Sequence, residues 1–374
     1  MNFPTEFEKG RQGKNVGLDI GIKELTVDTL GIQKEHIYCI AAPPKVGKTT
    51  LADFLFVLAV ICRSPNAKVD WIYYSWEISR IKKEFKFAAF FLFLDYKIQF
   101  FEYEGKQYKI SADYLMGKLM DDNKKPIPVN DDITEKVKII YRERIKPIFG
   151  EYNSRGQKIK KGRIDFIEEK DTPTGIKKYI MNYAKENGKF VMERYQVRDD
   201  NGQLETKYRV IGYEPNDPDK LLIVITDHVR KVKVEKGELL KQSVDKLASY
   251  QVDLRNLIKC TFVDIIHTNR NLFEVDRIKF AGEFLYPTPE DVKDTGNLSE
   301  EANVFFTMFD PNDDKYKLKK HFGLDLIDKQ GKVLHPHYKS LHIVEARDIE
   351  GTPIHYQLNM FGNINWFALL KRQL

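Results

Sequence analysis

The segment from His36 to Leu51, HIYCIAAPPKVGKTTL, constrains the fold most, because it joins a short apolar run to a glycine-containing loop and the start of a helix. Residues 37–40 are apolar and β-prone, as in a central parallel strand whose two faces are covered by helices. Residues 42–49, APPKVGKT, follow the phosphate-loop pattern GxxxxGK(S/T), except that Ala42 replaces the first glycine. This order of strand, loop and helix predicts a P-loop ATPase.

Each residue type in the loop has a physical role in holding phosphates. Gly47 lets the backbone approach the anion, and amide N–H groups at the helix start point toward it. Lys48 is expected to reach the β and γ phosphates of ATP, and the Thr49 hydroxyl to take a coordination position on Mg²⁺. The predicted nucleotide-binding residues are Ala42, Pro43, Pro44, Lys45, Val46, Gly47, Lys48, Thr49 and Thr50. The alternative is a chance GKT in a lysine-rich chain, but the apolar helix pattern of residues 50–61 favours the loop.

Composition bounds the class of protein. The chain has 374 residues, of which 42% are hydrophobic, so it can bury a sizeable core as one domain with large insertions or as two domains. Lysine plus arginine exceed aspartate plus glutamate by 61 to 55, and the net charge of +6 permits an anionic partner without requiring one. Three scattered cysteines without a CxxC pair predict neither a disulfide framework nor a zinc site. No segment is apolar for long enough to span a membrane, so we expect a cytoplasmic protein.

The rest of the chain predicts an α/β fold with a mostly parallel central sheet flanked by helices. Further buried-strand patterns occupy residues 69–75, 163–169, 221–225, 262–267, 303–309 and 340–346. Residues 1–16 are polar and predict an N-terminal arm or linker, which could pack on a neighbouring copy, whereas residues 17–374 form the ATPase domain. We expect a helical insertion at 85–160 and a β-hairpin insertion at 189–213, with the turn at Asp200, Asn201 and Gly202.

Two local patterns refine this prediction. The phenylalanine-rich run 85–96 fits either an exposed interaction surface or a satellite core under the insertion, and we favour the core. Thr172 and Pro173 have the residue types of a helix N-cap and first helical position, so a helix is expected to begin there.

Two carboxylates follow predicted strands at the places where ATP hydrolysis needs them. Asp227 ends the apolar strand that begins at residue 221, where a P-loop ATPase holds its Mg²⁺ shell; the alternative is an ordinary strand-ending aspartate. Glu77 lies just after the strand 69–75 and could polarise a water for in-line attack on the γ-phosphate. From the residues alone, Glu77 also fits a favourable negative charge in the first turn of a helix.

These motifs, in this order along the chain, resemble the RecA-like motor domain of DnaB-type (superfamily 4) replicative helicases. IAAPPKVGKTTLA is similar to the family's phosphate loop, in which alanine or glycine is familiar at the first position, and YYSWEIS resembles its FSLEMS motif. IVITDHV resembles the family's magnesium-binding strand, with His228 in place of tyrosine. IIHTNRN resembles its SQLNR sensor motif, with His267 in place of glutamine. IVEARDIEG resembles the arginine-finger segment, with Glu345 in place of lysine. The resemblance covers about residues 17–84 and 161–370.

The resemblance implies a role for each matching residue. Glu77 would be the catalytic base, Asp227 would hold the Mg²⁺ shell, and His267 would sense the γ-phosphate. Arg347 would enter a neighbouring subunit's site, where a cationic group stabilises charge on the transferred phosphoryl group. Two alternatives stay open: His267 fits a neutral, hydrogen-bonded histidine at a strand end, and Arg347 fits an intramolecular salt bridge.

In such motors, loops after the magnesium strand and after the sensor strand face the central channel. Here these loops are residues 230–241 and about 271–295, where Phe273 or Phe280 could stack a base. Basic side chains there would track the phosphate backbone without reading sequence. The predicted DNA-binding residues are Arg230, Lys231, Lys233, Arg270, Arg277 and Lys279. Charge runs of this kind also occur on ordinary solvated faces, which is the alternative.

The resulting prediction is an ATP-dependent DNA helicase or translocase that acts on single-stranded DNA in replication, as a ring or open helical hexamer that hydrolyses ATP at subunit interfaces. The family's amino-terminal collar domain has no counterpart in the sequence, which suggests a phage or mobile-element version in the host cytoplasm. A primase or a loader protein would be its candidate partner. One alternative is a RecA- or KaiC-like ATPase in recombination, regulation or packaging without unwinding. The other is a nucleotide-binding assembly or loader protein without turnover. His228, His267 and Glu345 depart from the family pattern, so this alternative stays open.

Overall fold

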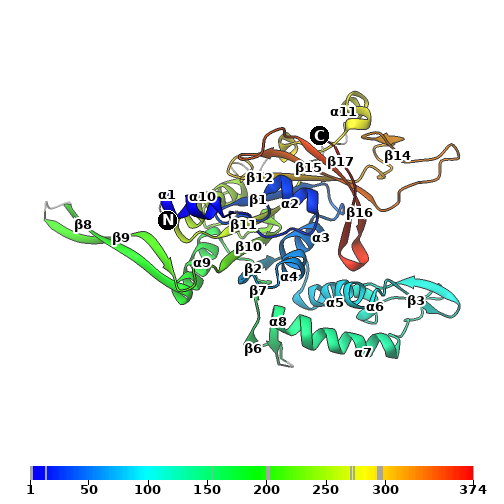
Figure 1. The fold of residues 1–374 in the computed structure, drawn as a ribbon, viewed down its shortest axis with the longest axis horizontal. Coiled ribbons are helices and arrows are strands. Elements are labelled where there is room, and N and C mark those ends of the chain that lie inside the picture. Colours follow the sequence, from blue (N-terminus) through cyan, green and yellow to red (C-terminus); the bar gives the residue numbers. More distant parts are fainter. Residues whose placement is uncertain are drawn as a thin grey trace.

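The computed structural model describes residues 3–12, 15–153, 155–198, 203–269, 272, 274–292 and 298–373. Nine strands of these residues form one central sheet: β1 (Ile37–Ala42), β2 (Val69–Ser75), β7 (Ile164–Ile167), β10 (Leu221–Asp227), β11 (Thr261–His267), β12 (Val304–Phe309), β15 (Tyr338–Ala346), β16 (Ile354–Phe361) and β17 (Trp366–Gln373). Their spatial order is β17-β16-β15-β12-β1-β11-β10-β2-β7 (Figure 1). The predicted α/β fold with a mostly parallel sheet is confirmed.

The six strands from β12 to β7 run parallel, and β15, β16 and β17 extend the sheet as antiparallel strands. β1 is buried along its whole length, as expected for a strand covered on both faces. Because β1, β2, β10 and β11 are parallel, their carboxyl ends meet at one edge of the sheet. Function in open α/β sheets concentrates at this edge.

Helices cover both faces of the sheet. One face packs against α3 (Lys48–Asp53), its continuation through a π-helical turn η1 (Phe54–Leu58) and α4 (Ala59–Arg63), and against α5 (Arg80–Tyr96). The other face packs against α9 (Pro173–Asn187) and α10 (Leu240–Ile258). The predicted cap of α9 is confirmed, because the Thr172 hydroxyl accepts a hydrogen bond from the Gly175 N–H at 3.1 Å. Shorter helices are α2 (Lys23–Thr29) and α11 (Val275–Ala281).

The region between β2 and β7 is only partly helical. After α5 it contains a hairpin of β3 (Phe100–Tyr103) and β4 (Lys106–Lys109), helices α6 (Ala112–Leu115), α7 (Asp131–Ile140) and α8 (Lys146–Phe149), the π-helical turn η2 (Tyr141–Ile145), and a hairpin of β5 (Gly150–Tyr152) and β6 (Lys158–Lys161). The two hairpins were not predicted, because strands this short carry little periodicity. Phe87, Phe90 and Phe91 are fully buried in the main core, so this run is not an exposed surface, and the favoured satellite core under the insertion was also wrong.

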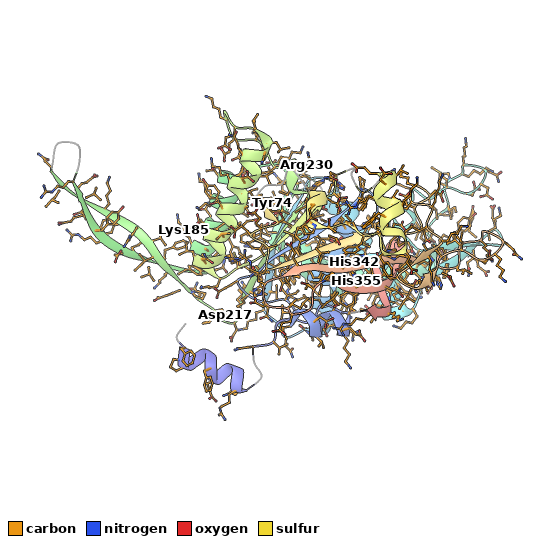
Figure 2. All side chains as sticks on the ribbon, turned by 90° about the horizontal axis from the view of Figure 1, so that it is seen from above. Tyr74, Lys185, Asp217, Arg230, His342 and His355 are labelled. Carbon is orange, nitrogen blue, oxygen red and sulfur yellow. The ribbon has the colours of Figure 1, made fainter. Side chains whose placement is uncertain are left out.

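Two elements project from the body. The hairpin of β8 (Gly188–Arg198) and β9 (Leu204–Pro215) extends outward on its own (Figure 1). Its expected turn, 200–202, lies outside the described residues. Residues 3–11 form helix α1 (Phe3–Arg11), which stands apart from the sheet (Figure 2) and exposes two stacked rings, Phe3 and Phe7. Among the described helices, none combines the length and apolarity needed to cross a membrane.

Candidate nucleotide-binding site

The phosphate loop leaves the carboxyl end of β1 and enters α3 at Lys48. Gly47 has a φ of 116°, a conformation that L side chains rarely adopt, so glycine is required there. A Cβ at this position would also lie 2.5 Å from Cε of Met360, at the end of β16. The loop motif predicts a glycine at this position. The proximity of Met360 could not be predicted, because this residue is on a strand distant in the sequence.

Lys48 is buried and folded back onto its own loop. Its Nζ donates to the carbonyl oxygens of Ala42 and Pro43, both at 3.1 Å, and to Nδ1 of His267 at 2.7 Å. Ala42 and His267 are register partners on β1 and β11, which explains why the histidine is within reach. Burial lowers the pKa of the Lys48 ammonium to about 8, against the opposing negative charges of Asp227 and Glu77.

Thr49 and Asp227 are directly bonded at the same edge. The Thr49 hydroxyl donates to Oδ1 of Asp227 at 3.0 Å. Oδ2 of Asp227 is buried without a hydrogen-bond partner in the described part of the chain, and burial raises the pKa of this carboxyl. A hydroxyl beside a buried carboxylate oxygen that lacks a donor is an oxygen ligand set of the kind Mg²⁺ prefers. The residues present therefore fit a Mg²⁺ ion.

Glu77, just past β2, faces two histidines and a lysine. Its Oε1 lies 2.8 Å from Nζ of Lys231, and the rings of His228 and His267 meet edge to face with centroids 3.9 Å apart. One metal-ligating atom from each of Glu77, His228 and His267 lies within 4.8 Å of the others. The peptide bond between Asp227 and His228 is cis.

The electrostatics of this group keep Glu77 charged and the histidines neutral. Burial favours a raised pKa for Glu77, but the hydrogen bond and charge of Lys231 outweigh it and hold the pKa below the ordinary value. Burial lowers the pKa of His228 to about 3 and that of His267 to about 4, and the nearby Lys48 charge adds to both shifts. At neutral pH the carboxylate is ionised and both imidazoles are uncharged.

Arg347 lies at the other edge of the sheet. It follows Ala346, whose register partner Val304 begins β12, so it is at the amino end of the parallel strands. Its guanidinium donates to the carbonyl oxygen of Glu300 at 2.6 Å and lies 3.7 Å from the Glu301 carboxylate. The arginine therefore belongs to no group around its own phosphate loop.

The predicted DNA-binding residues fall into different environments. Arg230 and Lys233 are exposed at the carboxyl edge, around the short 3-10 turn η3 (Val229–Lys231), whereas Lys231 pairs with Glu77. Arg277 donates to the buried Asp291 carboxylate and to the Tyr286 carbonyl, so its guanidinium is part of the fold. Lys279 is exposed on α11. Arg270 and Phe273 lie outside the described residues, and Phe280 is almost fully exposed.

A buried polar group behind the loop helix was not predicted. Nζ of Lys83 lies 3.0 and 2.9 Å from the two carboxylate oxygens of Asp53 and 3.0 Å from the Tyr73 hydroxyl, which also donates to Asp53 at 2.8 Å. These contacts join α3, which carries Lys48, to β2 and α5, which flank Glu77. The one signal in the sequence is Asp53 itself, a carboxylate inside an apolar helix pattern that requires a buried partner.

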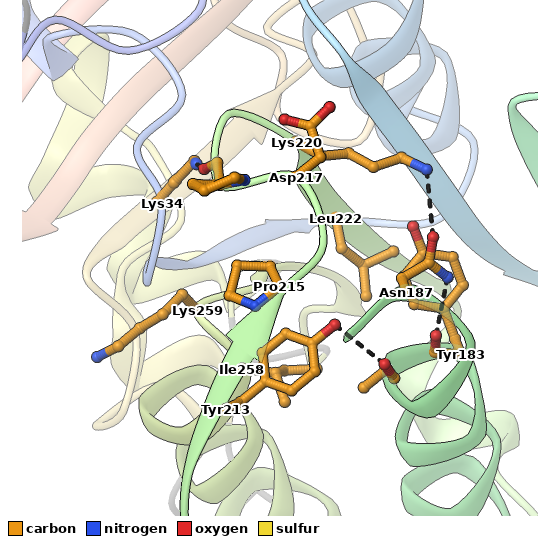
Figure 3. A pocket seen from close by; sticks show the side chains of 12 residues that line it. Lys34, Tyr183, Asn187, Tyr213, Pro215, Asp217, Lys220, Leu222, Ile258 and Lys259 are labelled. Carbon is orange, nitrogen blue, oxygen red and sulfur yellow. Dashed lines mark hydrogen bonds between the residues drawn. The ribbon is translucent and has the colours of Figure 1, made fainter. Parts of the chain in front are cut away.

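A separate pocket opens at the base of the β8–β9 hairpin (Figure 3), beside the amino end of β10. Its lining includes Tyr183, Tyr213 and Lys220, and Lys220 pairs with Asp70 at 2.6 Å. None of the predicted site residues lines it. The pocket is on the edge of the sheet opposite to the phosphate loop.

Comparison with known proteins supports the fold. No protein-family model and no curated protein matches the sequence significantly. Among solved structures, one that is described as an ATPase domain superposes with a TM-score of 0.62 at 12% identity, over 98% of this chain and 97% of that one. A DnaB-like replicative helicase, described with its interactions with primase, gives 0.60 at 14% identity, over 98% of this chain and 66% of its own longer chain. The chain has the RecA-like fold of DnaB-type ATPase domains. At these identities the likeness to DnaB-type domains is one of fold, so residue roles rest on the geometry above.

Proposed function

We propose that this protein is an ATP-dependent DNA translocase or helicase of the DnaB type, which acts on single-stranded DNA in replication and hydrolyses ATP between subunits. The proposal depends mainly on one observation: Lys48, Thr49, Asp227 and Glu77 meet at the carboxyl edge of a RecA-like sheet. This edge combines a phosphate ligand, a metal ligand set and an ionised carboxylate.

Nucleotide binding would begin with Lys48. Its three hydrogen bonds are to two loop carbonyls and a neutral imidazole, none of which is charged, so an anionic phosphate would compete for the ammonium effectively. Thr49 and Asp227 would hold Mg²⁺, which when bound supplies positive charge that neutralises the β and γ phosphates.

Glu77 would accept the proton of the attacking water. The carboxylate is ionised at neutral pH, and Lys231 has to release Oε1 before a water can be bound there. Nδ1 of neutral His267 accepts from Lys48, so the imidazole proton is on Nε2. That N–H would donate to a γ-phosphate, which is the sensor role proposed for His267.

We further propose a hexamer, as a ring or an open helix. Arg347 is half exposed at the edge opposite to its own phosphate loop, a position suited to completing the site of a neighbour. Helix α1 exposes Phe3 and Phe7, which a neighbouring subunit could cover. Arg230, Lys233 and Lys279 would contact the DNA backbone, and a primase or loader protein is a candidate partner.

The decisive experiment measures ATP hydrolysis with and without single-stranded DNA, followed by a strand-separation assay. The unmodified protein is compared with Lys48→Ala, Glu77→Gln and, as a control, Glu102→Gln, an exposed residue of strand β3. The proposal expects DNA-stimulated hydrolysis that the first two substitutions abolish and the control retains, together with strand separation or translocation.

Other outcomes identify the alternatives. Stimulated hydrolysis without translocation or strand separation would favour a RecA- or KaiC-like ATPase with another use. Binding of ATP without hydrolysis in any condition would contradict the proposed motor and favour a nucleotide-gated assembly or loader protein.

A further inference from the structure

Glu77, His228 and His267 converge although they come from three different strand ends. Glu77 follows β2, His228 follows β10, and His267 ends β11, and these three strands are neighbours in the sheet. We propose that these side chains form a binding site for a divalent transition metal ion of the Zn²⁺ or Co²⁺ kind, separate from the Mg²⁺ ligands Thr49 and Asp227.

The three candidate ligand atoms lie close together. One ligand atom from each residue lies within 4.8 Å of the other two, and the side chains would have to close in further to reach the roughly 2.0–2.2 Å bonds of such ions. The backbones are fixed by adjacent parallel pairing, in which Asp227 is the register partner of both Ser75 and Ile265. A rigid scaffold of this kind reduces the cost of assembling the ligands.

His228 supplies an independent observation. The residue is only 5% exposed, and its Nδ1 is buried without a hydrogen-bond partner in the described part of the chain. A buried polar atom without a partner costs about 1–3 kcal/mol. A bond from a ring nitrogen of this histidine to a metal ion would give the buried imidazole a function that its contacts in the fold do not provide.

The ligand types determine which ions fit. Two imidazole nitrogens and one carboxylate suit Zn²⁺, Co²⁺, Ni²⁺ and Cu²⁺, whereas Mg²⁺ takes oxygen ligands and keeps much of its water. Three protein ligands also leave a coordination position for water or a phosphate oxygen. The site would therefore bind a transition metal in the presence of a large excess of Mg²⁺.

Two lysines compete with the metal ion. Lys231 holds Oε1 of Glu77 at 2.8 Å, and Lys48 holds Nδ1 of His267 at 2.7 Å. The second oxygen of Glu77 is an alternative ligand atom, whereas His267 can bind a metal ion only after Lys48 releases Nδ1 or the imidazole proton moves from Nε2 to Nδ1. Both ammonium charges also oppose a nearby dication. Removing the Lys231 ammonium should accordingly strengthen metal binding, which a non-specific surface site would not show.

The test is titration of the nucleotide-free full chain with Co²⁺ in millimolar Mg²⁺, followed by the visible ligand-field absorption of bound Co²⁺. We expect one high-affinity Co²⁺ per chain, at least about tenfold weaker binding in His228→Gln and in His267→Gln, and tighter binding in Lys231→Ala. His335→Gln, a histidine outside the group, is the matched control and should bind as the unmodified protein does.

Either of two results would overturn the proposal: no absorption change under excess Mg²⁺, or equal affinity in the unmodified protein and both cluster-histidine variants. Thermal melts of the variants establish that they are folded, and Lys231→Ala tests the site with all three ligands intact. The titration needs no ATP, so it distinguishes failure of the metal site from failure of the proposed ATPase.

Discussion

The ammonium group of Lys48 lies 2.7 Å from Nδ1 of His267, so the lysine of the phosphate loop is held by the neighbouring strand β11. Two carbonyl oxygens of its own loop complete the contacts. The lysine is thus ordered before a nucleotide arrives, in a buried environment that favours its neutral form.

Nucleotide affinity should therefore depend on pH through Lys48. Burial lowers the pKa of its ammonium to about 8, and phosphates bind the charged form, so affinity should fall as pH rises above about 8, approaching tenfold per pH unit. Fluorescent ATP-analogue titrations from about pH 7 to 9.5 would measure this. Lys48→Arg keeps its charge throughout and should show a flatter profile at whatever affinity it retains. Equal slopes in the two proteins would refute the assignment.

Gly47→Ala should weaken nucleotide binding at least about tenfold, for two separable reasons. The new Cβ meets Met360 at 2.5 Å, and the φ of 116° is strained for alanine by roughly 1–3 kcal/mol. Calorimetric titration of nucleotide into Gly47→Ala, Met360→Ala and the double variant separates the steric clash from the backbone strain. Met360→Ala alone should bind almost normally, and the double variant should recover only part of the loss; full recovery would show that backbone strain is unimportant.

The buried pair Lys83 and Asp53 should be among the most sensitive positions of the fold. Lys83→Met leaves a fully buried carboxylate without its cation, which costs about 3–5 kcal/mol. Urea denaturation should show this loss, and Asp53→Asn combined with Lys83→Met should cost less than the sum of the single variants because the charges are removed together.

An exposed pair provides the control for that measurement. Lys106 and Asp122 also form an ion pair, but both side chains are mostly in solvent. Lys106→Met should leave the urea midpoint essentially unchanged. A loss as large as that of Lys83→Met would mean that burial is not the cause.

Asp264 should make the protein less stable as pH rises. Burial raises the pKa of this carboxyl to about 7, while Gln251 donates a hydrogen bond to it at 3.0 Å. The folded state holds a proton that the unfolded state releases near pH 4, so the free energy of unfolding should decrease between about pH 4 and 7 and then level off. Asp264→Asn should remove this decrease and be more stable at pH 7.5, by roughly 2–4 kcal/mol. Urea denaturation midpoints measured from about pH 4 to 7.5 would test this. If the midpoint changed with pH equally in both proteins, the raised pKa of Asp264 would be contradicted.

Arg230 and Lys233 should contribute to DNA binding through charge alone. Replacing both by alanine should weaken binding of single-stranded DNA and lower the slope of log affinity against log salt by about 1.4, or about 0.7 for each phosphate contact. Fluorescence anisotropy at several salt concentrations measures the slope. Lys118→Ala with Lys125→Ala, exposed in the insertion, removes the same charge and should leave the slope unchanged. An identical slope in all three proteins would exclude these residues from the DNA path.

The central strands were predictable because each is a buried apolar run. The pattern of residues 69–75 coincides with β2, and that of 221–225 identifies β10 to within two residues. β16 and β17 were missed, because antiparallel strands toward the sheet edge mix polar and apolar residues and carry no continuous run. Their presence depends on pairing with β15, which is not a local property of the sequence.

In the candidate site, too, local features could be predicted from the sequence and long-range contacts could not. The loop motif indicated Lys48 and Thr49, and a strand end indicated Asp227, because each of these two patterns is local in the sequence. The contact of Gly47 with Met360 joins parts of the chain more than three hundred residues apart, and no spacing rule contains it. The proposed role of Arg347 requires a second subunit, so it stays a prediction.

The β8–β9 hairpin has a hydrodynamic consequence. Its strands contain 11 and 12 residues, which at about 3.3 Å per residue extend roughly 35 Å. A projection of this length adds friction with little mass, so each subunit should sediment and diffuse more slowly than a sphere of its weight. Elution volume from a sizing column would then overstate the number of subunits in an assembly, whereas light scattering, which responds to mass, would not.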